Sequence, residues 1–181
     1  MSTENFIKLS RNCDAILIPS GDKIKLMEGT LVKITQSLGG DYTLYVNGNL
    51  VTILAKDADA IGKKSIKNKF INSKSSSKVD EEQVWVQLKT CYDPEIPVNI
   101  VDLGLIYDLS IKKNKNKENI VNIKMTLTAP GCGMGPYIAQ DVETKVKVVP
   151  GVFDVVVELV WEPVWNRDMM TEEAQLELGM M

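Results

Sequence analysis

Histidine is absent from this sequence of 181 residues. Its absence excludes Ser-His-Asp and Cys-His nucleophilic sites, the HExxH zinc helix and the His-bearing zinc deaminase signature. The three cysteines are Cys13, Cys91 and Cys132, and no two of them form a CxxC pair. This excludes a zinc ribbon, a thioredoxin-like redox pair and a self-contained ferredoxin site. Any metal cluster on this chain would need ligands from carboxylates, from a small thiol or from another subunit.

Long apolar runs and a strong net charge are lacking as well. No signal peptide or apolar stretch of membrane-spanning length is present, and the formal net charge is −3. A slightly acidic chain gives no general reason to expect binding to nucleic acid or to an anionic membrane. The odd number of widely spaced cysteines fits a reducing compartment and not a disulfide framework. We therefore predict a cytoplasmic protein with no nucleic-acid or membrane partner.

The first part of the chain, residues 1–62, has the pattern of a small all-β module. Residues 1–11 carry little pattern and are expected to form a loosely ordered arm. Short apolar runs follow, separated by turn residues, and Asn47-Gly48 between two of them is a strong hairpin signal. Residues 63–78 contain six lysines and no acid, which predicts a basic flexible linker. The remaining residues, 79–181, have the pattern of a second domain.

This second domain alternates helical and extended patterns. Asp80 is a good N-cap for a first helix, residues 105–111 and 121–128 alternate as two strands, and Pro136 opens a second helix. Residues 152–161 are nearly all apolar and predict a central strand covered on both faces. The two tryptophans that follow are expected to cover the core, and residues 171–178 to form a short acidic helix. The predicted fold class is α+β: a small three-stranded mixed sheet with two helices on one face, preceded by the all-β module.

Cys132 lies in a glycine-rich loop between the second strand and the second helix. Free backbone N–H groups and the positive end of the helix dipole favour a thiolate there, although a small apolar cysteine in a tight turn is an equal alternative. The strand alternation places Thr126 and Thr128 on the face opposite Met125 and Leu127, so their hydroxyls can hydrogen-bond the loop or a sulfur bound there. Asp93 and Glu95 form a stiff acidic turn, of a kind that is also common after helices.

Four blocks of residues, in this order, carry a resemblance to one family. The blocks are Asp93 to Ile100 (DPEIPVNI), Asp102 to Tyr107 (DLGLIY), Thr126 to Thr128 leading to Cys132, and Trp161 to Trp165. Together they resemble the small domain shared by SufT-type iron-sulfur assembly factors, PaaD-type subunits and the eukaryotic cytosolic iron-sulfur targeting proteins. The resemblance spans Val79 to Met181 and is less close at Glu162 and Val164. The β-rich extension is similar to that of the SufT subgroup.

The resemblance implies an auxiliary factor in iron-sulfur cluster assembly, in the manner of the SUF system. By position, the family's reactive cysteine falls on Cys132, its threonine pair on Thr126 and Thr128, and its acidic turn on Asp93 and Glu95. We predict that Cys132, with the two threonines, transiently handles iron or an iron-sulfur cluster, and that Asp93 and Glu95 add oxygen ligands or take up a proton.

The predicted partners are the assembly machinery or client apoproteins, and a homodimer would supply further thiolates. One alternative is a PaaD-like accessory subunit that docks on a specific metalloenzyme. A cysteine-dependent enzyme is disfavoured, because its general base would have to be Asp93 or Glu95 and no substrate cavity is evident. We therefore predict that the chain is not an enzyme.

Overall fold

The computed structural model describes residues 5–64 and 78–180. The chain divides into two compact units, Met1–Lys67 and Asn68–Met181, and each is described here by itself. Most of the predicted linker, residues 65–77 of 63–78, lies outside the described residues.

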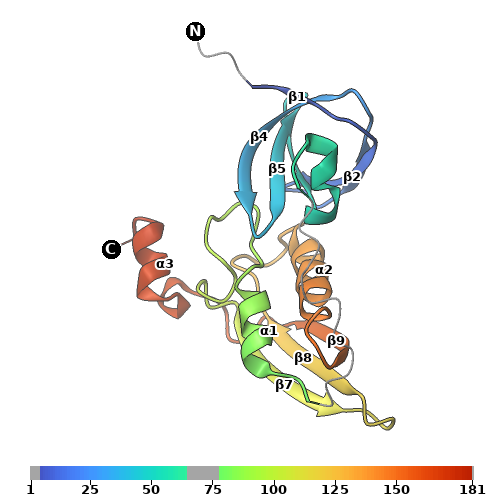
Figure 1. Ribbon diagram of the computed structural model, residues 1–181. Coiled ribbons are helices and arrows are strands. Elements are labelled where there is room, and N and C mark those ends of the chain that lie inside the picture. Colours follow the sequence, from blue (N-terminus) through green and yellow to red (C-terminus); the bar gives the residue numbers. More distant parts are fainter. Residues whose placement is uncertain (1–4, 65–77, 181) are drawn as a thin grey trace. The chain divides into compact units, whose positions relative to one another are not determined.

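The first unit is the small all-β module expected from the sequence. Its strands form one sheet in the order β1-β4-β5-β6-β2-β3, and all neighbouring strands are antiparallel (Figure 1). The strands are β1 (Ile7–Lys8), β2 (Cys13–Ile18), β3 (Lys23–Leu26), β4 (Leu31–Leu38), β5 (Asp41–Val46) and β6 (Asn49–Ile53). A 3-10 helix, η1 (Ala55–Ile61), follows the last strand and was not predicted.

The β5–β6 hairpin confirms the Asn47-Gly48 prediction. Val46 pairs with Asn49, so the loop has two residues, and both have positive φ, 48° at Asn47 and 88° at Gly48. Asparagine and glycine tolerate this backbone conformation best, and the resulting turn matches the twist of the flanking strands. The hairpin therefore fixes which residues of β5 and β6 face the core.

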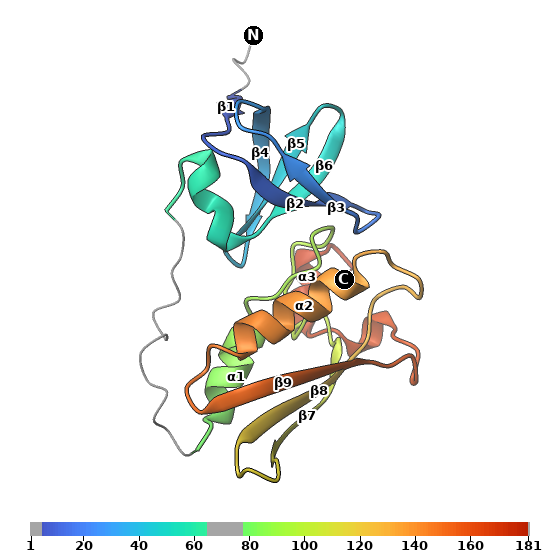
Figure 2. The same ribbon diagram turned by 90° about the vertical axis from the view of Figure 1, so that its right-hand side faces the viewer.

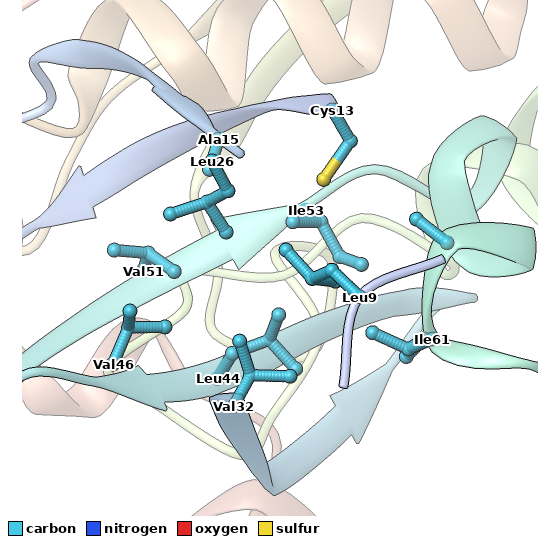
Figure 3. Packing of buried hydrophobic residues seen from close by; sticks show 11 residues of the cluster. Leu9, Cys13, Ala15, Leu26, Val32, Leu44, Val46, Val51, Ile53 and Ile61 are labelled. Atoms are coloured by element: carbon cyan, nitrogen blue, oxygen red, sulfur yellow. The ribbon is translucent and has the colours of Figure 1, made fainter. Parts of the chain in front are cut away.

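The core of this unit lies between the sheet and η1. Figure 3 shows side chains from β2, β3, β4, β5 and β6 converging with Leu9 and Ile61. The prediction of a loose arm at residues 1–11 is wrong for the described part: β1 pairs with β4, Leu9 is 2% exposed, and Arg11 forms ion pairs with Asp57 and Asp59. Two apolar residues are too few for a periodic pattern, so only the tertiary pairing identifies this strand.

The second unit has a three-stranded mixed sheet in the order β7-β8-β9, with β7–β8 antiparallel and β8–β9 parallel. Its elements are α1 (Glu81–Leu88), β7 (Ile106–Lys113), β8 (Asn119–Met125), α2 (Gly135–Val146), β9 (Val152–Leu159), η2 (Arg167–Met169) and α3 (Glu172–Glu177). Figure 2 shows α1 and α2 on the same face of the sheet. This arrangement confirms the predicted fold class.

Both helices follow from their sequence patterns. Asp80 caps α1 by accepting a hydrogen bond from the Glu82 N–H at 3.0 Å, and Val84 and Leu88 are fully buried. In α2, Pro136 lies in the first turn, and Ile138, Val142 and Val146 form a buried stripe. The two helices pack against each other, and α2 packs against β9, so these stripes make the core of the unit.

Two strand predictions are wrong in detail. Strand β9 was predicted to be central and covered on both faces, but it is an edge strand, and Phe153 and Val156 are 54% and 49% exposed. An apolar run alone does not tell a buried strand from an edge strand. Strand β8 ends at Met125, three residues before the predicted end at Thr128, because the chain turns towards the Cys132 loop.

The C-terminal segment lies along the turn that precedes β7. The Trp165 indole N–H donates to the Leu103 carbonyl at 2.8 Å, and the Thr171 N–H donates to the Asp102 carbonyl at 2.9 Å. Thr171 also caps the predicted acidic helix, α3, by accepting from the Ala174 N–H. Trp161, in contrast, is 43% exposed and does not cover the core as expected. No helix among the described residues is long and apolar enough to span a membrane.

Candidate functional site

The Cys132 loop connects the end of β8 to the start of α2. Gly131, with φ of 77°, turns the chain, and the Cys132 carbonyl accepts a hydrogen bond from the Gly135 N–H at 3.1 Å. Cys132 thus lies two residues before the helix N-cap, Met134, whose side chain makes no capping hydrogen bond. The first N–H groups of α2 are therefore not satisfied by a capping side chain.

Cys132 differs from the other two cysteines in its exposure. Cys13 and Cys91 are buried, at 4% and 0% exposure, whereas Cys132 is half-buried. A ligand or a reacting group reaches a sulfur from solvent, so Cys132 is the most accessible of the three cysteines.

The two threonines are placed differently from each other. Thr126 is 1% exposed, and its N–H donates to the Leu105 carbonyl at 2.9 Å, whereas Thr128 is half-buried. Because β8 stops at Met125, the alternation that was used to place both hydroxyls on one face does not apply beyond that residue. Leu127 is also buried, so Thr126 and Leu127 break the alternating pattern together.

The acidic turn holds one buried and one exposed carboxyl group. Asp93 is 3% exposed, and its Oδ1 accepts a hydrogen bond from the Glu95 N–H at 3.0 Å. Burial raises the pKa of Asp93 above its ordinary value, and the hydrogen bond from Glu95 opposes this only in part. Glu95 itself is exposed. The turn therefore holds one buried carboxyl group with a raised pKa, Asp93, and one solvent-exposed carboxyl group, Glu95.

The predicted ligands do not form a metal site within one molecule. Across residues 5–64 and 78–180, no three side chains of histidine, cysteine, aspartate or glutamate are grouped so that they could hold a metal ion. Cys132, Asp93 and Glu95 are thus not gathered into a three-ligand set.

A cavity of about 640 Å³ lies elsewhere in the second unit and was not predicted. It is lined by Gly104, Ile106, Tyr107, Asp108, Lys124, Val160, Glu162, Pro163 and Met169. None of the predicted site residues lines it. Its lining comes from β7, from β8 and from segments before β7 and after β9, so no local pattern of the sequence marks it.

Replacing Asp93 with asparagine should raise the stability of the second unit at neutral pH. The raised pKa means that the ionised side chain costs folding free energy, and this cost is present only above the unfolded pKa of about 3.9. Asparagine can still accept the hydrogen bond from Glu95, so we expect Asp93→Asn to gain on the order of 1 kcal/mol at pH 7 and nothing below pH ~4.

Urea denaturation followed by tryptophan fluorescence measures this gain, because Trp85, Trp161 and Trp165 all lie in the second unit. Glu95→Gln at the exposed position is the control and should change little. A variant Asp93→Asn that is less stable at pH 7 would show that the ionised carboxylate is stabilised by the fold.

The second unit matches known proteins. A family model described as "Iron-sulfur cluster assembly protein" matches residues 81–159. A "Fe-S protein maturation auxiliary factor" of Porphyromonas gingivalis is 50% identical over 101 residues, which are 56% of this chain and 92% of that protein. "Fe-S protein maturation auxiliary factor SufT" of Staphylococcus aureus is 42% identical over 87 residues, 48% of this chain and 94% of that protein.

A third relative, "Fe-S protein maturation auxiliary factor YitW" of Bacillus subtilis, is 37% identical over 99 residues, 55% of this chain and 93% of that protein. In all three comparisons about half of this chain covers nearly the whole relative. These relatives are therefore too short to contain a counterpart of both units. The predicted likeness of the β-rich extension to the SufT subgroup finds no support in them.

Proposed function

Because this chain belongs to the iron-sulfur cluster assembly protein family, whose matched members are named maturation auxiliary factors, we propose that Cys132 is its working thiolate. The chain acts in the cytoplasm as a non-enzymatic factor for the maturation of iron-sulfur proteins. Its cargo is iron or an iron-sulfur cluster, which it holds transiently and passes on. The observation that carries this proposal is the accessibility of one thiol, Cys132, while Cys13 and Cys91 are buried.

The small number of potential metal ligands supports transient binding of iron or a cluster at Cys132. One thiolate is a soft ligand that suits iron, but four are needed for a common cluster. Since no three potential ligands are grouped in the described residues, the missing ligands come from the assembly machinery, a client apoprotein or a second copy. A site with too few ligands of its own releases its cargo easily, which is what a transfer factor needs.

The neighbouring polar residues have distinct roles in this proposal. Thr128, half-buried three residues after the end of β8, is close enough in sequence to donate its hydroxyl hydrogen to a sulfur held at Cys132. The buried Thr126, whose N–H donates to the Leu105 carbonyl, fixes the chain where it leaves β8 for the Cys132 loop. Asp93 and Glu95 supply oxygen ligands or accept a proton during transfer.

The test is substitution of Cys132 by serine, with Cys13→Ala as a control that also removes one thiol. Iron and sulfide are added to the purified proteins without oxygen, and cluster formation is followed by visible absorption and gel filtration. We expect Cys132→Ser to abolish the cluster absorption and Cys13→Ala to retain it. Cells that carry Cys132→Ser should lose activity of iron-sulfur enzymes under iron limitation.

Unchanged enzyme activities in those cells would contradict the proposal. Isolation of the chain in a fixed ratio with one metalloenzyme would instead favour the accessory-subunit alternative. Turnover of a substrate by the purified chain that is lost in Cys132→Ala would indicate an enzyme.

A further inference from the structure

Three of the four sheet edges in the described residues carry features that prevent pairing with another chain. Strand β1 has only two residues. Strand β3 carries Lys23 and Lys25, and β7 ends with Lys112 and Lys113 and contains a register shift. Very short edges, lysines and bulges are the usual protection of edge strands. The fourth edge, β9, is built differently.

Strand β9 has eight residues, VFDVVVEL, with no lysine and no proline. Its single irregularity lies at its start, where Asn119 pairs with Val152 and Ile120 with Asp154, so the strand is regular from Asp154 onwards. Within the described residues no strand other than β8 pairs with it, and Figure 2 shows it at the open side of its sheet. A long, regular, apolar edge of this kind is a template for strand addition.

The direction of the backbone groups on β9 follows from one hydrogen bond. The Val160 N–H donates to the Met125 carbonyl at 2.8 Å. In a parallel pair alternate residues bond to the same neighbour, so the even-numbered residues of β9 face β8. Val155, Val157 and Leu159 therefore direct their N–H and C=O groups to the open edge.

We propose that this edge pairs with β9 of a second copy of the chain, in an antiparallel arrangement around a two-fold axis at Val157. The two three-stranded sheets then form one six-stranded sheet. The proposal concerns a surface separate from Cys132, so it stands or fails independently of the proposed thiol chemistry.

The charges on β9 select this register. Centred on Val156, the pairing would place Asp154 opposite Glu158 of the second copy, twice, and like charges in opposed positions are destabilising. Centred on Val157, it places Glu158 opposite Val156 of the second copy, and no acid lies directly opposite another. It also uses only the regular part of the strand, from Asp154 to Leu159, together with Val160, which directly follows it.

The same register continues the hydrophobic core. Val155, which is 5% exposed on the helix-covered face, lies opposite Leu159 of the second copy, and Val157 lies opposite its own equivalent. Pairs of branched aliphatic residues in opposed positions stabilise a sheet. The strand is therefore complementary to itself in backbone hydrogen bonding and in the placement of its charges, which is the requirement for a two-fold interface.

This dimer keeps the two thiols apart. The carboxyl ends of β8 and β9 lie at the same end of each three-stranded sheet. Antiparallel pairing therefore places the two Cys132 loops at opposite ends of the combined six-stranded sheet. From strand spacings, the two copies of Met125 lie on the order of 20 Å apart. The dimer thus presents two separate thiols and does not complete one site with both.

Sedimentation of the full-length chain over a wide concentration range tests the proposal. We expect the wild type to reach twice the monomer mass. Val157→Pro removes an N–H group at the open edge and leaves the β8–β9 hydrogen bonds in place, so it should raise the dimer dissociation constant at least about tenfold. A monomeric wild type, or a Val157→Pro protein that still dimerises, would overturn the proposal.

A second pair of variants does not depend on proline. Val156 is 49% exposed and lies opposite Glu158 of the second copy in the proposed register. Val156→Asp should weaken the dimer, because it places acid against acid, whereas Val156→Lys should retain or strengthen it. Val86→Asp on α1, at 58% exposure, is the control and should leave the mass unchanged. Equal behaviour of the two Val156 variants would rule out this register.

Discussion

Replacing Lys145 with alanine is expected to destabilise the second unit by about 3 kcal/mol. The Lys145 ammonium group donates to Oδ2 of Asp141 at 2.8 Å and to the Thr90 carbonyl at 2.8 Å. The side chains of Lys145 and Asp141 are only 12% and 6% exposed. Removing one member of a buried ion pair leaves the other charge in a poorly solvated place without this partner, which costs more than the pair contributes.

The position of this ion pair explains why the loss of folding stability in Lys145→Ala should be large. Thr90 follows the C-terminal end of α1, and Lys145 lies in the last turn of α2. The lysine thus links the two helices that cover the sheet, and its charge also favours a carbonyl at a helix C-terminus. Its loss leaves both the Asp141 carboxylate and the Thr90 carbonyl without this donor.

The sequence provides a matched control two residues away. Lys147 and Asp154 form an ion pair at 2.9 Å, but their side chains are 49% and 44% exposed. Lys147→Ala should change stability by less than about 0.5 kcal/mol, because exposed pairs are screened by water. Urea denaturation followed by tryptophan fluorescence compares the two. Equal losses of stability in Lys145→Ala and Lys147→Ala would show that burial does not make the Lys145 ion pair more stabilising than an exposed one.

A double substitution separates the charge from the packing. Asp141→Asn with Lys145→Met removes both charges and keeps most of the buried volume and the lysine's aliphatic stem. We expect this protein to be more stable than Lys145→Ala alone. A double variant that is less stable than the single one would show that the charges themselves hold the helices together.

The parts of the fold that follow from local patterns could be predicted from the sequence. The Asn47-Gly48 hairpin and the Asp80 cap depend on residues within a few positions of each other, and the structure confirms both. The buried stripe of α2 is equally local. Such features need no knowledge of the rest of the chain, because turn chemistry and helical periodicity act over one or two turns.

The errors arose where distant residues decide the outcome. Ile7 and Leu9 are ordered by pairing and packing with residues far along the chain, and β9 is an edge strand because no further strand follows it in the described fold. For the site, the sequence predicted that the Cys132 loop lies between the second strand and the second helix of this unit, β8 and α2. It did not predict that β8 ends at Met125 or that Asp93 is buried while Glu95 is not, because both depend on tertiary packing.

Replacing Gly104 with alanine is expected to destabilise the second unit by about 3 kcal/mol or more. Gly104 has φ of 72°, a conformation that costs an alanine on the order of 1 kcal/mol. A Cβ atom there would also overlap the Met169 carbonyl oxygen and come within 2.7 Å of the Met169 carbonyl carbon. The contact is with backbone, so a rotamer change cannot relieve it.

The expected structural result is displacement of the C-terminal segment. That segment is held against the same turn by the bonds from Trp165 to Leu103 and from Thr171 to Asp102. If Met169 moves away from Gly104, these bonds lengthen or break, because all three contacts lie within a few residues. We therefore expect Gly104→Ala to shift tryptophan emission towards the solvent-exposed wavelength and to speed proteolysis within the C-terminal segment.

Gly131→Ala separates the effect of the contact from that of the backbone conformation. Gly131 has a similar φ of 77°, but nothing lies within 4 Å of its Cβ position. The Gly131→Ala variant should therefore lose only the part of the stability that depends on backbone conformation, about 1 kcal/mol, and its C-terminal segment should stay in place. If the two variants lose equal stability, the close approach of Met169 contributes nothing. In that case the backbone angles of the turn at Gly104 alone set its shape, and the segment that packs on it does not.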